Sequence, residues 1–67
     1  MNAEHIKFRI EMALALLQVI SEDTEENFVA SGLNNAIIAR GKITLSSLYI
    51  LSDYLSSIKN ELDKEGV

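Results

Sequence analysis

The residues of this chain that could do chemistry are few, and their spacing does not converge on a catalytic or metal-binding pattern. The 67 residues contain one histidine, His5, and no cysteine, which excludes thiolate sites, disulfides and multi-histidine metal sites. The serines lack a nucleophile elbow, and no glycine-rich phosphate loop is present. The acids at positions 22, 23, 25 and 26 lack the spacing of a calcium-binding loop. We therefore expect no enzyme activity and no cofactor or metal.

Composition bounds the class of protein. The chain is 48% hydrophobic and 24% charged, with a net charge of −4, as in a small acidic globular domain. We expect one domain over residues 1–67. The longest unbroken apolar run is the six residues 12–17, whereas a membrane helix needs about 20. The first residues also lack the long apolar core of a secretory signal, so we expect a cytoplasmic protein.

The absence of proline and the apolar periodicity predict an all-α fold. We expect two long helices, over about residues 3–20 and 45–64, and a shorter middle helix over about residues 25–39. Gly32 lies inside the middle segment and leaves its continuity open. The expected N-caps are Asn2, Thr24 and Thr44, and the expected C-terminal stops are Gly41 and Gly66.

The first predicted helix carries two apolar sets on different sides. One set has alternating spacings of four and three residues: Ile6, Ile10, Ala13, Leu17 and Ile20. The second set is centred about 140° from the first at 100° per residue. It comprises Phe8, Met12, Ala15, Leu16 and Val19. A helix that is apolar on both sides needs partners on both sides, and a chain this short supplies one of them.

The last predicted helix carries a seam of its own, with spacings of 3, 4, 3 and 4 residues: Leu48, Leu51, Leu55, Ile58 and Leu62. Small cores of this size are usually completed by oligomerisation when disulfides and metals are absent. We therefore predict a helical bundle completed by homodimerisation. The residues predicted to carry packing or association are Ile6, Phe8, Ile10, Met12, Leu16, Val19, Leu51, Leu55 and Ile58.

The function predicted from this pattern is protein–protein interaction. By analogy with small phage- or plasmid-borne proteins, the homodimer would regulate or inhibit a partner protein. No acid occurs between residues 27 and 52, and within this stretch residues 31–48 resemble part of the phage-repressor type of helix-turn-helix domain. This resemblance implies an alternative, a DNA-binding transcriptional regulator. The side chains facing DNA would then be Asn34, Asn35, Arg40 and Lys42.

Overall fold

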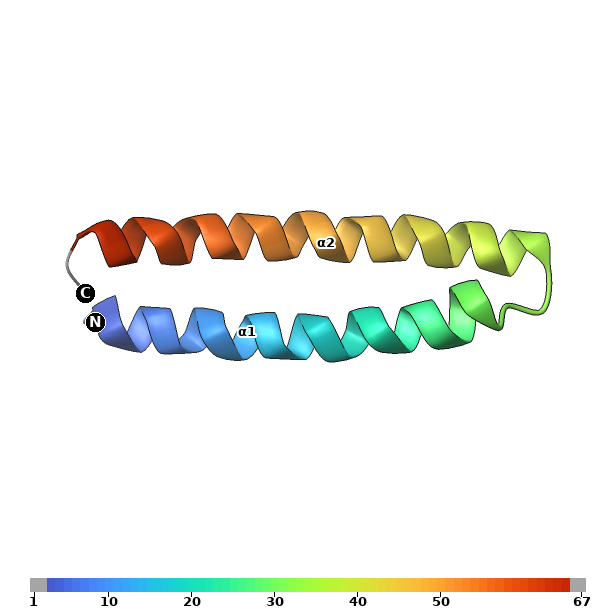
Figure 1. Cartoon of the computed structure of the whole chain (residues 1–67), viewed down its shortest axis with the longest axis horizontal. Helices are drawn as coiled ribbons and strands as arrows, with labels where there is room; N and C mark the ends of the chain where they lie inside the picture. The colour runs from blue at the N-terminus through green and yellow to red at the C-terminus, as the bar shows by residue number, and fades with distance from the viewer. Residues whose placement is uncertain (1–2, 66–67) are drawn as a thin grey trace.

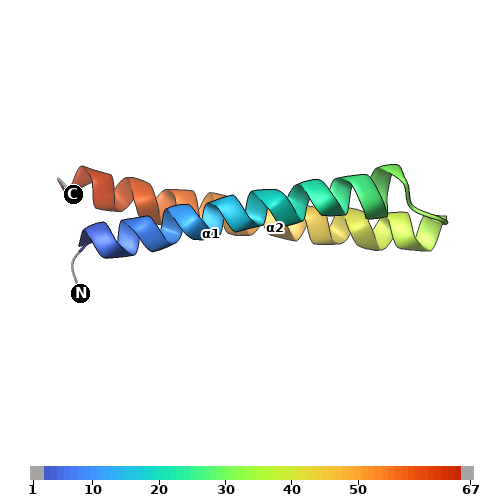
Figure 2. The ribbon, with the colours of Figure 1, turned by 90° about the horizontal axis from the view of Figure 1, so that it is seen from below.

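The computed structural model describes residues 3–65 and shows a long helical hairpin (Figure 1). Helix α1 spans Ala3–Thr24 and continues without a break into the π-helix η1, Glu25–Ala30. A short bend then leads into α2, Asn35–Lys64, which runs back along the full length of α1. The two arms cross at a small angle when seen from below (Figure 2). The predicted all-α fold with two long helices is confirmed.

The boundaries in the middle of the chain differ from those predicted. The segment 25–39 is not a separate helix, because its first part extends α1 and its last part begins α2. The chain reverses at residues 31–34, where Gly32 interrupts the helical pattern. The interruption thus falls at Gly32, where the sequence left the continuity of the middle segment open, whereas the predicted break between residues 20 and 25 is wrong.

Three predicted helix ends do not occur where they were expected, for local reasons. Thr24 has helical backbone angles, and its hydroxyl donates to the Ile20 carbonyl at 2.8 Å instead of capping a new helix. Gly41 and Thr44 lie inside α2. No proline or left-handed residue stops α2 at Gly41, so the helix continues past both positions. The expected cap at Asn2 and stop at Gly66 lie outside the described residues.

The two arms pack through a narrow seam with helical spacing. Its most buried apolar side chains are Ile10, Leu17 and Leu45, each with an exposed fraction of 8%. Toward the bend the seam becomes polar and small, with Ser21 and Thr24 buried on α1. No side chain among the described residues is less than 2% exposed. The hairpin therefore has a seam of contacts and not an enclosed core.

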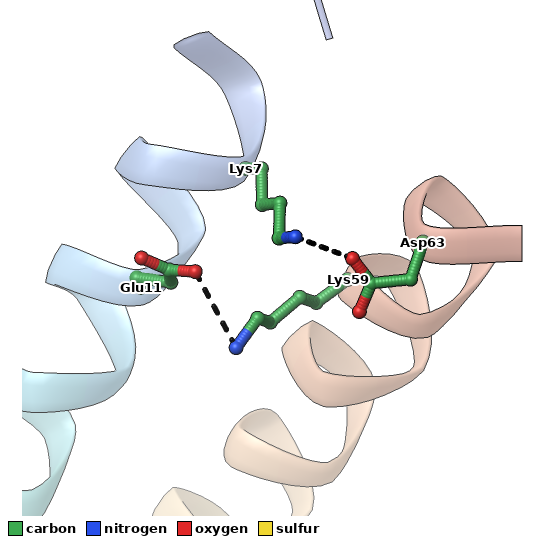
Figure 3. A network of polar contacts seen from close by, with 4 residues as sticks. All are labelled: Lys7, Glu11, Lys59 and Asp63. Atoms are coloured by element: carbon green, nitrogen blue, oxygen red, sulfur yellow. Dashed lines mark ion pairs between the residues drawn. The ribbon is translucent and has the colours of Figure 1, made fainter. Parts of the chain in front are cut away.

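Two ion pairs tie the open end of the hairpin together (Figure 3). Lys7 donates to the carboxylate of Asp63, and Lys59 Nζ lies 3.4 Å from Glu11 Oε1. The hydrogen bond to Asp63 raises the pKa of Lys7 above its ordinary value, so the Lys7 ammonium is charged at neutral pH. The two pairs have opposite polarity, with the cation on α1 in one pair and on α2 in the other. They show which residues of α1 and α2 lie side by side.

Near the bend the backbones of the two arms approach closely at Gly41. A Cβ at this position would lie 2.6 Å from the Phe28 carbonyl oxygen and 2.9 Å from its carbonyl carbon. We expect Gly41→Ala to lower the free energy of unfolding by about 1–3 kcal/mol, despite alanine's better helix propensity, because the backbone of η1 must move away. Chemical denaturation followed by circular dichroism measures the change. Ser46→Ala, at an exposed position of α2, is the control, and a Gly41→Ala variant more stable than the parent would contradict the close approach.

Helix α2 begins with a side-chain cap. Asn34 has extended backbone angles, and its side-chain oxygen accepts a hydrogen bond from the Ile37 N–H at 3.0 Å. Asn34→Ala should lower the free energy of unfolding by about 1 kcal/mol, whereas Asn34→Asp should retain the parent's stability. Asn35→Ala, one residue into the helix, is the matched control. Equal denaturation midpoints for Asn34→Ala and Asn35→Ala would show that the cap contributes nothing.

Candidate protein-interaction surface

The most prominent feature of the surface is its exposed apolar side chains. Two helices that lie side by side can cover one stripe of side chains on each helix. The helices of this chain carry more apolar stripes than that. Leu16 and Val19 of α1 are 62% and 63% exposed, and Ile50 of α2 is 64% exposed. The other large apolar side chains exposed among the described residues are Phe8, Met12, Ile20, Phe28, Leu33, Ile43, Tyr49, Leu51, Tyr54 and Ile58.

A hollow beside the bend shows which flanks of α1 and α2 lie on the same side of the hairpin. Thr24 and Phe28 of the first arm line this hollow of about 470 Å³ together with Arg40 and Thr44 of α2. Ile20 lies one turn before Thr24, and Leu16 one turn before Ile20.

The flank of α2 on this side of the hairpin is identified by Thr44, which lines the same hollow. Leu51 and Ile58 follow Thr44 at intervals of seven residues, which keeps all three on one flank of α2. The flanks of the two arms together form one apolar face, defined here as Leu16, Ile20, Leu51 and Ile58.

The opposite side of the hairpin is polar. A second hollow there is lined mostly by polar side chains: Gln18, Ser21 and Glu22 of α1 and Tyr49 and Ser52 of α2, together with Leu14. Gln18 donates to Glu22 at 3.2 Å, in a contact one helical turn long. Among residues 3–65, none of the large aliphatic side chains exposed on the surface lines this hollow, so the two broad sides of the hairpin differ in character.

The outer edge of α1, which faces away from α2, is also apolar. Phe8, Met12, Ala15 and Val19 follow one another at spacings of four, three and four residues, and all four are exposed. This is the second apolar set predicted for the first helix, apart from Leu16, which lies toward the apolar face. Its exposure agrees with the expectation that one chain cannot cover both sides of α1.

The residues predicted to carry packing or association divide into two groups. Ile6, Ile10 and Leu55 pack in the seam between α1 and α2, where Ile10 is buried and the other two are half-buried. The remaining six are exposed on the apolar face or the outer edge of α1: Phe8, Met12, Leu16, Val19, Leu51 and Ile58. The first group thus holds the hairpin together, and only the second group is free to meet another molecule.

Sequence reasoning missed part of the exposed surface. Ile20 was assigned to the inner set of the first helix, yet its side chain is 48% exposed on the apolar face. Ile43, Ile50 and Tyr54 form an exposed row on α2 at spacings of seven and four residues. Ile50 and Tyr54 lie within the helix predicted over residues 45–64, whereas Ile43 lies between this helix and the stop predicted at Gly41.

The residues of the DNA-binding alternative do not lie in a helix-turn-helix. Residues 31–48 form the bend and the first half of one continuous helix, so this part of the prediction is wrong. The reason is that Gly41 permits the close contact with Phe28 instead of reversing the chain. Asn34 caps α2, Asn35 begins it, and Arg40 lines the hollow beside the bend. Lys42 is exposed on the next turn of α2.

The polar side chains that could bind a metal or react either hydrogen-bond to a neighbour on the same helix or lie far from one another. Among residues 3–65, no three metal-ligating side chains gather into a cluster. Within the acidic cluster after Ser21, Asp23 accepts a hydrogen bond from Asn27 at 2.8 Å and Glu22 accepts one from Gln18.

No helix among residues 3–65 combines the length and apolar character that a membrane crossing requires. The apolar face and the outer edge of α1 are therefore the strongest candidates for a functional surface.

Comparisons with known protein families, with curated proteins and with solved structures found no match for this chain.

Proposed function

We propose that this chain is a non-enzymatic protein–protein interaction module that acts in the cytoplasm as a homodimeric regulator or inhibitor of a partner protein. The observation that carries the proposal is the set of large apolar side chains exposed on one broad side of the hairpin and on the outer edge of α1. Large apolar side chains that gather on one exposed face are typical of sites that bind other proteins.

The amount of exposed surface supports pairing with a second copy. The chain exposes 5070 Å², whereas a compact monomer of its mass exposes about 4200 Å². The excess of roughly 900 Å² is close to the ~800 Å² that each partner buries in a standard protein interface. The radius of gyration of 15.0 Å, against about 11 Å for a compact chain of this length, reflects the same elongated shape. A second hairpin on the apolar face would form a four-helix bundle of ordinary proportions.

The outer edge of α1 would then remain for the partner protein. The spacing of Phe8, Met12, Ala15 and Val19 matches the a and d positions of a helix pair, and the small side chain of Ala15 permits close approach. Glu4, Glu11 and Glu22 flank this row on one side. A partner of complementary chemistry is an amphipathic helix with an aliphatic stripe and basic flanking residues.

DNA binding, the alternative function, rests on the acid-free stretch that contains Arg40 and Lys42. Both cations are exposed, but they lie two positions apart on α2 and therefore point to different sides. Retention on DNA at low salt that is lost in the Arg40→Ala/Lys42→Ala variant would support this function. Absence of retention at low salt would exclude it.

The homodimer can be tested with one substitution on each broad side of the hairpin. Leu16→Glu, on the apolar face, should weaken the dimer by roughly tenfold or more, because each Leu16 loses the favourable burial of a large apolar side chain. Tyr49→Glu, on the polar face, should leave the dimer intact. Sedimentation equilibrium measures the association, and circular dichroism checks that both variants remain helical, as expected for side chains that are 62% and 54% exposed in the hairpin.

Equal weakening by both substitutions would contradict the assignment of the apolar face. Loss of helix in Leu16→Glu at concentrations where the parent is monomeric would also contradict it, since Leu16 would then stabilise the single hairpin.

A further inference from the structure

The position of each residue along the long axis of the hairpin, called its height here, defines how a second copy fits on the apolar face. Lys7 lies opposite Asp63 and Glu11 lies opposite Lys59, so residue numbers at one height add up to about 70. Near the bend, Phe28 contacts Gly41, which extends nearly the same rule to the other end of the hairpin. Any exposed residue of α2 can therefore be assigned the height of a residue of α1.

The apolar face has a clear centre on this scale. Ile58 lies at the height of residue 12 of α1, and Leu51 lies at the height of residue 19. Leu16 and Ile20 lie on α1 itself, so the face extends from about height 12 to height 20. A symmetric dimer places its two-fold axis at the centre of a self-complementary patch. The apolar side chains thus put the axis near Leu16.

The charges on the same flank of α1 give the centre independently. Arg9, Leu16, Ile20 and Asp23 follow one another at spacings of seven, four and three residues, which places all four on one stripe. Arg9 and Asp23 are both exposed. An antiparallel copy of α1 brings Arg9 of each chain opposite Asp23 of the other when the axis lies midway between them, which is again at residue 16.

We propose that the second copy lies antiparallel on the apolar face, with α1 against α1, α2 against α2 and the two-fold axis near Leu16. This arrangement rests on the proposed homodimer and specifies it. It pairs the cation of each α1 with the acidic end of the other. It also places the outer edges of both α1 helices on the same side of the bundle, where the partner protein is proposed to bind.

The competing arrangement has both hairpins pointing the same way, with α1 of each chain against α2 of the other. The two acidic ends, each containing Glu22, Asp23, Glu25 and Glu26, would then gather at one end of the bundle. Like charges placed together at an interface are unfavourable. In the antiparallel arrangement each acidic end lies about eight residues from the axis, so the two ends are about 24 Å apart along the bundle at 1.5 Å per residue.

Spin-label distances distinguish the two arrangements, and the absence of native cysteine makes single labels clean. Ala15 and Ala39 are both exposed and lie outside the apolar face, so labelled Ala15→Cys and Ala39→Cys chains should keep the dimer. In the antiparallel dimer, Ala15 lies near the axis and the two labels should be within about 20 Å. Ala39 lies at the height of residue 31, some 15 residues from the axis, so its labels should be about 40 Å or more apart at 1.5 Å per residue.

Two hairpins pointing the same way would place each label at the same height as its copy. Both distances would then fall below about 30 Å, the width of a four-helix bundle, and the Ala15 labels would not be the closer pair by a wide margin. That result would overturn the antiparallel arrangement and leave the homodimer standing. A chain that sediments as a monomer throughout would instead overturn the proposed function on which the arrangement rests.

A charge-reversal cycle provides a second measurement that does not depend on labels. Arg9→Glu should weaken the dimer by about fivefold or more, and Arg9→Glu combined with Asp23→Arg should restore it. The control is Glu11→Lys with Lys59→Glu, which reverses a pair within one hairpin and should leave the dimer constant unchanged. Failure of Asp23→Arg to rescue Arg9→Glu would contradict the pairing of these residues across the interface.

Discussion

The geometry of a two-helix hairpin is the constraint on which the rest of this structure depends. Two cylinders in contact can shield one stripe of each from water, and this chain has apolar residues on two stripes of α1 and on two of α2. Even in the seam, the best-buried apolar side chains keep an exposed fraction of 8%. Burial of apolar area is the main favourable term in folding, so the hairpin leaves much of its available stabilisation unused until another molecule covers it.

The seam itself changes in character along its length. At the open end, long side chains meet and two ion pairs of opposite polarity set the register of the arms. Toward the bend the seam is lined by Ser21, Thr24 and Gly41, whose small side chains allow the backbone of η1 to approach α2. The π-helix lies in this close-packed part. An extra residue per turn is a known device at functional positions, and here it accompanies the hollow beside the bend.

Much of the fold follows from sequence periodicity, and the parts that do not have identifiable causes. The spacing of Ile6, Ile10, Ala13 and Leu17 predicts the inner side of α1, because helical periodicity is a strong signal. The middle of the chain is less predictable. Thr24 and Thr44 look like caps in the sequence, but a threonine also fits inside a helix when its hydroxyl bonds back to the preceding turn, as that of Thr24 does.

Gly41 illustrates the same ambiguity for glycine. A glycine after a helical pattern usually marks a C-terminal stop, whereas here it marks the place where another backbone approaches. Only the tertiary contact separates these two roles. A stop at Gly41 also leaves Ile43 outside the predicted helices and is compatible with the helix-turn-helix resemblance of residues 31–48. The exposed set on α1 was predictable because it required no knowledge of the bend.

The proposed function depends most on a second copy of the chain covering the apolar face. The most direct test is the molar mass of the unmodified chain by light scattering on a sizing column, measured across a hundredfold dilution. We expect a mass near twice 7.4 kDa at the higher concentrations of this dilution series. A well-folded particle of 7.4 kDa at every concentration would contradict it.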